Sequence, residues 1–242
     1  MGQDVRLSVD SATQTATFQG PSGYQVEMAY LGNGQWEQPK GLDATLSKGG
    51  SGYNYTLRFN KTGQVFRFIG DAKLDRIENA SGHRLVMGYD GERLTSVTDT
   101  RGEVTRMAYD SAGRLTTVTD PRGRTNSYAY SSGDLVSWTD AAGQTTRYSY
   151  DSAHRVTSVT DARGGVTRLA YDSTGRATSV TWANGGVTRY SYGSEGQVTM
   201  TDPNGNAWKY DFDGLGRMQS LDTPRGGSPI TRSESPRVWW RL

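Results

Sequence analysis

Residues 81–90 read SGHRLVMGYD, and the same phrase returns as RGEVTRMAYD (101–110), RGRTNSYAYS (122–131), AGQTTRYSYD (142–151) and RGGVTRLAYD (163–172). In each copy the closing tyrosine follows the glycine by seven positions, as in Gly82 and Tyr89. A fixed period of this kind indicates a repeat architecture, in which each unit packs on its neighbours. Such a chain builds a surface, and it is a poor place to look for a single catalytic site.

The phrase belongs to a longer unit that begins with an Asp or Asn three residues before the glycine. This position recurs every 19–21 residues, at Asn60, Asn79, Asp99, Asp120, Asp140, Asp161, Trp182, Asp202 and Asp222. The block from Asp to Tyr keeps its length, whereas the arm between Tyr and the next Asp varies. About six residues separate successive turns, a common strand length. We therefore predict an all-β fold, an array of antiparallel hairpins forming a long, twisted, spiralling sheet, or partial β-shell.

The turns have a specific chemistry. Asp120-Pro121-Arg122-Gly123 carries the residues preferred in a type I turn that leads into a left-handed glycine, and Asp110-Ser111-Ala112-Gly113 repeats it without proline. His154 stands where other repeats have this glycine, so we predict a left-handed conformation for it.

Alternation along the constant arm predicts two different faces. One face carries Thr105, Thr146, Thr167 and Thr188, then Met107, Tyr128, Tyr148, Leu169, Tyr190 and Tyr210, then the tyrosine column that ends in Phe212. The other carries Arg67, Arg106, Arg147, Arg168, Arg189 and Lys209, followed by small residues. In the variable arm, Leu115 and Val118 are three apart, which puts them on opposite faces unless a bulge intervenes.

Composition limits the function classes. The 242 residues contain 27 Lys and Arg against 25 Asp and Glu, which argues against a general nucleic-acid binder, and no cysteine. Few aliphatic residues and 14 tyrosines indicate a folded chain with a thin core. We find no signal peptide and no apolar run long enough to span a membrane. We expect a bacterial cytoplasmic location before export by a specialised secretion system, or the cell surface as part of a longer chain.

Three regions are predicted. Residues 1–58 form a lead-in β region, with strands around Arg6–Val9, Ala16–Phe18, Tyr24–Met28 and Tyr53–Leu57 and a loop from Trp36 to Leu42. Residues 59–222 form about eight repeats of 20–21 residues. Residues 223–242 form a polar, basic, poorly ordered tail whose Trp239 and Trp240 dock on the last hairpin.

The Tyr-Asp pairs at 89–90, 109–110, 150–151 and 171–172, with the stretch YDSAGRLTTVTDPRGRTNSYAY, resemble the RHS, or YD-repeat, family of bacterial polymorphic toxins, insecticidal toxin complexes and teneurins. The resemblance implies hairpins joined edge to edge into a hollow shell that encloses a toxic C-terminal domain. No self-cleavage site or toxin follows the repeats here, so we expect an N-terminal or truncated piece. Its partners would be the rest of the shell and its cargo, or a chain at an exposed sheet edge.

We predict a non-enzymatic structural module with no catalytic, cofactor-binding or metal site. No nucleophile elbow, Walker loop or dinucleotide fingerprint occurs, and the chain has only His83 and His154 to serve as a base. Asp202-x-Asn204-x-Asn206 resembles a calcium loop, but it coincides with the repeat's turn and lacks the distal glutamate. The alternative function is a surface carbohydrate-binding or adhesion module that binds glycans on the aromatic face. The arginine face either meets an acidic cargo or pairs with neighbouring carboxylates and solvent.

Overall fold

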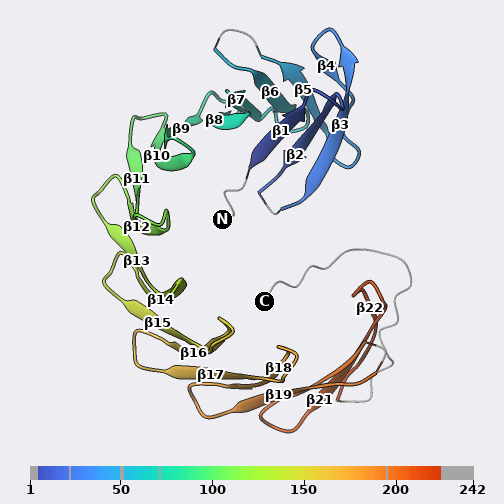
Figure 1. Ribbon diagram of the computed structural model, residues 1–242, viewed down its shortest axis with the longest axis vertical. Coiled ribbons are helices and arrows are strands. Elements are labelled where there is room, and N and C mark those ends of the chain that lie inside the picture. Colours follow the sequence, from blue (N-terminus) through green and yellow to red (C-terminus); the bar gives the residue numbers. More distant parts are fainter. Residues whose placement is uncertain (1–4, 22, 50–51, 71, 195, 225–242) are drawn as a thin grey trace. The chain divides into compact units, whose positions relative to one another are not determined.

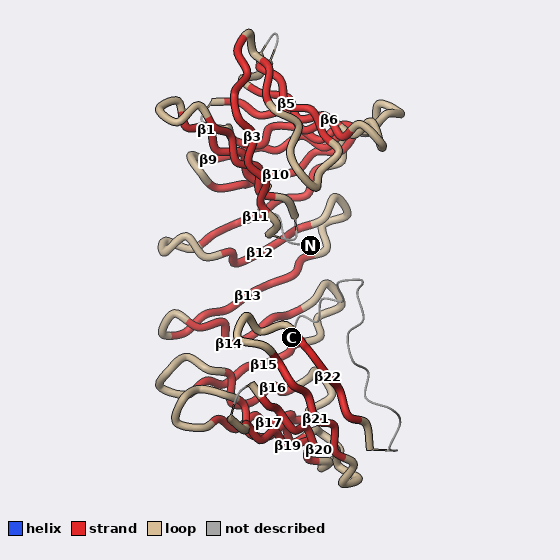
Figure 2. Tube along the Cα trace, turned by 90° about the vertical axis from the view of Figure 1, so that its right-hand side faces the viewer, coloured by secondary structure: helices blue, strands red, loops and turns tan. Residues whose placement is uncertain are grey.

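The computed structural model describes residues 5–21, 23–49, 52–70, 72–194 and 196–224. Throughout these residues the chain consists of strands and turns without helices, as Figure 2 shows, which confirms the all-β prediction. The chain divides into two compact units, residues 1–127 and 128–242. Within each unit, strands that follow one another in the chain pair as antiparallel neighbours (Figure 1). The predicted hairpin array is confirmed.

The strands of the first unit are β1 Arg6–Asp10, β2 Thr15–Gln19, β3 Gln25–Gly32, β4 Gln35–Trp36, β5 Ala44–Lys48, β6 Tyr55–Phe59, β7 Val65–Ile69, β8 Lys73–Glu78, β9 Arg84–Asp90, β10 Arg93–Asp99, β11 Val104–Tyr109 and β12 Leu115–Thr119. Strand β13, Thr125–Ser131, contains the division between the units. The second unit continues with β14 Asp134–Thr139, β15 Thr145–Tyr150, β16 Val156–Thr160, β17 Val166–Tyr171, β18 Ala177–Thr181, β19 Val187–Tyr192, β20 Gln197–Thr201, β21 Ala207–Phe212 and β22 Met218–Asp222.

Strands β1–β8 enclose a hydrophobic core. Its largest fully buried side chains are Phe18, Met28, Leu46, Leu57 and Phe68. β1 lies close to β8, so the beginning of the chain packs near a strand of the predicted repeats. The expected thin core holds for the described residues after β8, where no hydrophobic side chain is buried, whereas in β1–β8 aromatic and aliphatic side chains from many strands converge on one side.

The four predicted lead-in strands correspond to β1, β2, β3 and β6, each within a few residues. Two strands were missed. Trp36 ends the short strand β4, so the predicted loop begins after it, and Ala44–Lys48 forms β5, whose Ala44 and Leu46 point into the core. The tail from residue 225, including Trp239 and Trp240, lies outside the described residues.

The repeats have the predicted turns. The Gly123 N–H donates to the Asp120 carbonyl and the Asp120 N–H to the Arg124 carbonyl, both at 2.9 Å. Gly123 has a φ of 80°, and His154, in the equivalent place of another turn, has a φ of 60°. The left-handed conformation predicted for His154 is confirmed.

A β-bulge answers the question that the spacing of Leu115 and Val118 left open. Leu115 pairs with Tyr109 and Thr117 with Ala108, so Thr116 is an extra residue on β12. Val118 then lies opposite Met107, on the same face as Leu115. The same irregularity recurs in β16 and β18, where Thr157 and Thr178 are the extra residues. The bulge directs both apolar side chains of the variable arm to the aromatic face.

The bulge also explains why the variable arm changes length. β20 has no bulge, because Val198 pairs with Tyr192 and Thr199 with Ser191, and this arm is one residue shorter than its neighbours. The arm that contains β10 is also one residue shorter. It keeps the bulge, and the turn between β9 and β10 is the part that is shorter. The constant arm keeps its register in both cases.

The last predicted turn position needs a correction. Asp222 pairs with Lys209 in the last hairpin, as Thr119 pairs with Arg106 in an earlier one. Asp222 is therefore the last strand residue, and the turn position falls on Thr223.

Candidate functional site: the two faces of the repeat array

The tyrosine column holds neighbouring hairpins together. Each of five tyrosines donates its hydroxyl to a backbone carbonyl fifteen residues earlier, where the preceding hairpin begins its second strand. The pairs, at 2.6–2.8 Å, are Tyr89 with Leu74, Tyr109 with Leu94, Tyr150 with Leu135, Tyr171 with Val156, and Tyr192 with Ala177. Burial raises the pKa of Tyr89, Tyr150 and Tyr192 above the ordinary value. The hydroxyls of this column thus satisfy the backbone of the sheet.

We expect Tyr171→Phe to lower the local free energy of unfolding by about 1–2 kcal/mol, because the Val156 carbonyl loses its donor in a half-buried place. Hydrogen exchange of the β16 and β17 amides measures the loss. Tyr148→Phe is the matched control, since the Tyr148 ring lies on the same face and its hydroxyl bonds to no described residue. Equal losses of exchange protection in the two variants would show that the hydrogen bond from Tyr171 to Val156 does not stabilise the sheet.

The turns between the two strands of a repeat are clamped by an Asp and an Arg four residues later. The Asp Oδ1 accepts from backbone N–H groups of the turn, and the Asp Oδ2 accepts from the arginine Nε at 2.6–2.8 Å. The pairs are Asp110–Arg114, Asp151–Arg155, Asp172–Arg176 and Asp213–Arg217. Two of these guanidinium groups also cover the tyrosine of the following hairpin, Arg155 over Tyr171 and Arg176 over Tyr192. One arginine thereby connects a turn to the next repeat.

These clamps predict a loss of stability in acid. Backbone N–H groups lower the pKa of Asp110 and Asp213, and side-chain hydrogen bonds lower the pKa of Asp151 and Asp172. A lowered pKa stabilises the fold above the unfolded value of about 4, and this contribution disappears as the pH falls through the folded value. Urea midpoints should stay constant from about pH 6 to 5 and fall below about pH 4. Asp172→Asn should reduce that fall, and an equally steep fall in this variant would argue against the clamp.

His154 contacts an aspartate of the neighbouring hairpin, at two positions where other repeats have a glycine and an arginine. Its Nδ1 lies 2.9 Å from Asp134 Oδ2, twenty residues earlier. In other repeats the same offset joins an arginine to a glycine: a Cβ on Gly113 would approach Arg93 Nη2 to 2.8 Å, and one on Gly175 would approach Arg155 Nη1 to 3.6 Å. The glycine makes room for the guanidinium, and where Asp134 replaces the arginine, an imidazole fills that room.

This exchange can be tested by restoring the common pair. Asp134→Arg alone should destabilise the second unit, because its guanidinium meets the His154 ring, and adding His154→Gly should recover most of the loss. A double-mutant cycle on thermal unfolding should give an interaction of about 0.5–1 kcal/mol. Strictly additive effects on the free energy of unfolding would show that the two side chains do not interact.

The opposite face of the array carries the predicted basic column. Arg106, Arg147, Arg168, Arg189 and Lys209 are all exposed, while their strand neighbours on the aromatic face are half-buried or buried, so the two-faced pattern is confirmed. Arg67 differs, because it pairs with Glu78 at 3.0 Å in the first unit.

The remaining sequence candidates show no reactive arrangement. Asp202 Oδ1 accepts from the N–H groups of Asn204 and Asn206, so the calcium-like motif forms the repeat's turn. His83 lies beside Asn79 in another turn. Across the part of the chain that the structure describes, no group of three or more His, Cys, Asp or Glu could hold a metal ion. In the same residues no helix has the length and apolar character needed to cross a membrane.

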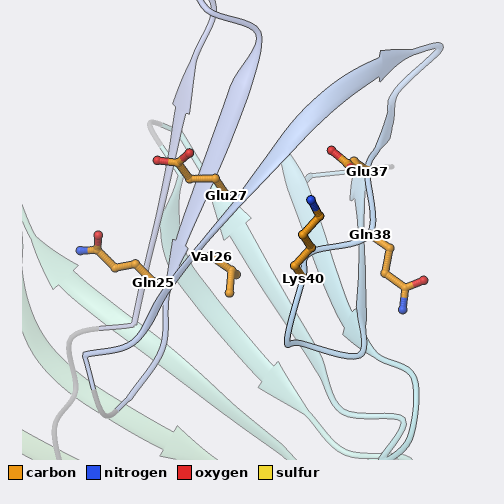
Figure 3. A pocket seen from close by; sticks show the side chains of 6 residues that line it. All are labelled: Gln25, Val26, Glu27, Glu37, Gln38 and Lys40. Carbon is orange, nitrogen blue, oxygen red and sulfur yellow. The ribbon is translucent and has the colours of Figure 1, made fainter. Parts of the chain in front are cut away.

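One pocket of about 400 Å³ lies in the first unit. It is lined by β3 and the chain after β4, through Gln25, Val26, Glu27, Glu37, Gln38 and Lys40, and Figure 3 shows their side chains spread around an open groove. The charged residues among them are the carboxylates Glu27 and Glu37 and the ammonium group of Lys40.

Comparison with known proteins gave no match among curated sequences. Among solved structures the chain is similar to TcdB2-TccC3-Cdc42, with 13% identity and a TM-score of 0.48, to TcdB2-TccC3, with 14% and 0.44, and to the Photorhabdus luminescens Tc holotoxin pore, with 14% and 0.45. These alignments cover 86%, 86% and 89% of this chain and 15% of each matched chain. The chain therefore spans about a seventh of the length of those structures.

The sequence itself matches the RHS Repeat family over residues 89–125, 130–166, 171–207 and 196–228. Three of the matches begin at a column tyrosine, Tyr89, Tyr130 or Tyr171, so the family pattern has the same phase as the hairpins. Together they cover more than half of the chain, which belongs to the RHS repeat family.

Proposed function

We propose that this chain is a non-enzymatic wall segment of an RHS-type β-shell, which encloses or presents the toxin cargo of a bacterial polymorphic-toxin system. The observation that carries the proposal is the succession of hairpins in RHS phase, five of which are tethered to the one before by a tyrosine hydroxyl. Such a wall grows by adding hairpins, and strand twist and β-bulges are features that bend a sheet.

The chemistry of the described residues supports a scaffold. The tyrosine hydroxyls, the turn aspartates and the turn arginines are engaged in bonds that hold the repeats together. The chain's partners would then be the adjoining parts of the shell and the cargo inside it. Binding of glycans to the aromatic face stays an untested alternative, and the tyrosine tethers favour a packing role for that face.

The test is to isolate, from the source cells, the native assembly that contains this chain and to examine it by cryo-electron microscopy and limited proteolysis. We expect a continuous hairpin wall around a second polypeptide region that resists protease until the wall is opened with denaturant. An assembly in which the repeats surround nothing, or a substrate turnover that disappears with His154→Ala, would refute the proposal.

A further inference from the structure

Three arginines in the second unit stand on the exposed face with no ion pair to any described residue. They are Arg147 on β15, Arg168 on β17 and Arg189 on β19. The sheet itself spaces them. β16 separates the first two and β18 the next two, and the pairing offsets each arginine from the one before by two residues along the strands, so neighbouring arginines are roughly 12 Å apart. We call these three residues the arginine row.

The row differs from three arginines in the turns of the same unit. Arg155, Arg176 and Arg217 are each bound by an aspartate four residues earlier in the same turn. Aspartates are therefore available in every repeat, yet none of them reaches the row. The guanidinium groups of the row are left free for a ligand from outside this chain.

The surroundings of the row repeat with it. A serine on the preceding strand and a threonine on the following strand lie directly opposite each arginine: Ser137 and Thr160 beside Arg147, Ser158 and Thr181 beside Arg168, and Ser179 and Thr201 beside Arg189. Strands β15–β20 contain no Asp or Glu at all. These six strands therefore place hydroxyl groups beside the cations and carry no carboxylate of their own.

We propose that the arginine row binds an acidic polypeptide segment of a partner chain. The inference rests on the proposed function and deepens it, because it names the chemistry of what the wall faces. A guanidinium binds a carboxylate through two parallel hydrogen bonds, and neighbouring hydroxyls can donate to the same anion. An extended chain rises about 3.3 Å per residue, so a run of Glu or Asp can supply a carboxylate to each arginine.

Nucleic acid fits this face less well. Proteins that bind single strands stack bases on aromatic side chains beside the cations. Here the tyrosines Tyr148, Tyr150 and Tyr190 lie on the opposite face of the sheet. The row offers charge without a stacking platform.

The test uses the purified chain and two fluorescent probes, a poly-glutamate peptide and a poly-thymidine single strand, at low and at physiological ionic strength. One triple variant removes the row by the substitutions Arg147→Gln, Arg168→Gln and Arg189→Gln. Its matched control, Arg84→Gln, Arg122→Gln, Arg163→Gln, removes three other exposed arginines that form no ion pair with a described residue. Circular dichroism and the melting temperature show that both variants are folded.

We expect the parent to bind poly-glutamate in a salt-sensitive manner, the row variant to bind about tenfold more weakly, and the control to stay within about twofold. No binding by the parent, equal losses in both variants, or tighter binding of poly-thymidine than of poly-glutamate would overturn the inference. None of these results affects the test of the wall, because enclosure in the native assembly is measured separately.

Discussion

Replacing Phe18 with alanine is expected to lower the free energy of unfolding of the first unit by about 3–5 kcal/mol. Phe18 is fully buried in β2, and its ring meets the edges of Tyr24, Phe59 and Phe66 at 6.1–6.2 Å between centroids. Removing it leaves a cavity in the one core that strands β1–β8 share. Urea unfolding followed by near-ultraviolet circular dichroism measures the change.

The control for this prediction is Leu31→Ala. Leu31 lies two-thirds exposed at the end of β3, so its truncation should change the free energy of unfolding by less than about 0.5 kcal/mol. Hydrogen exchange should localise the Phe18→Ala effect to β1–β8. If the first unit tolerated Phe18→Ala as well as Leu31→Ala, the core described above would not be what stabilises it.

Deleting Thr167 from β17 should have an effect of similar size on the second unit. β17 is a constant arm, with Arg168 on one face and Tyr171 on the other side of the sheet, tethered to Val156. A one-residue deletion in a strand exchanges its faces, so either the turn before it or Tyr171 loses its place. We expect a loss of about 3 kcal/mol or more in the exchange protection of β16–β18. Protection like that of the parent would show that the constant arm does not set the register.

The sequence predicted what depends on local chemistry. Asp120, Gly123 and His154 could be placed because a type I turn followed by a left-handed residue is specified by its own few residues. The alternation that separates Arg147 from Tyr148 follows from strand geometry alone. The family resemblance rested on these same repeating positions, and the family match confirms it.

What the sequence did not predict depends on contacts between distant residues. The core around Phe18 and Leu57 assembles from separate strands, and the alternating pattern of β5, with Ala44 and Leu46 inward, is too short to stand out. The tyrosine tether joins residues fifteen apart in neighbouring hairpins, so nothing within one repeat reveals its acceptor. Asp134 and His154 stand twenty residues apart, where other repeats have an arginine and a glycine. This constant offset could have been found in the sequence, but it indicates a contact only once the hairpins are placed side by side.

Some expectations stay predictions. The domain boundaries after residues 58 and 222, the lack of enzymatic activity, and the export of the chain are not decided by the fold.

The structure does show on which face Leu115 and Val118 lie, because the pairing of β11 with β12 contains a bulge at Thr116. A bulge of one residue leaves little trace in a sequence rich in Thr, Ser and Val.

The central claim is that the constant arm fixes the register of the wall while the variable arm absorbs changes in length, and a crystal structure of the chain lacking Thr157 tests it most directly. Thr157 is the bulge residue of β16. We predict that β15 and β16 then pair without interruption, as β19 and β20 do, that the Tyr150 hydroxyl still bonds to the Leu135 carbonyl, and that the free energy of unfolding changes by less than about 1 kcal/mol. A structure in which the register shifts in β15, or in which Tyr150 leaves Leu135, would contradict the claim.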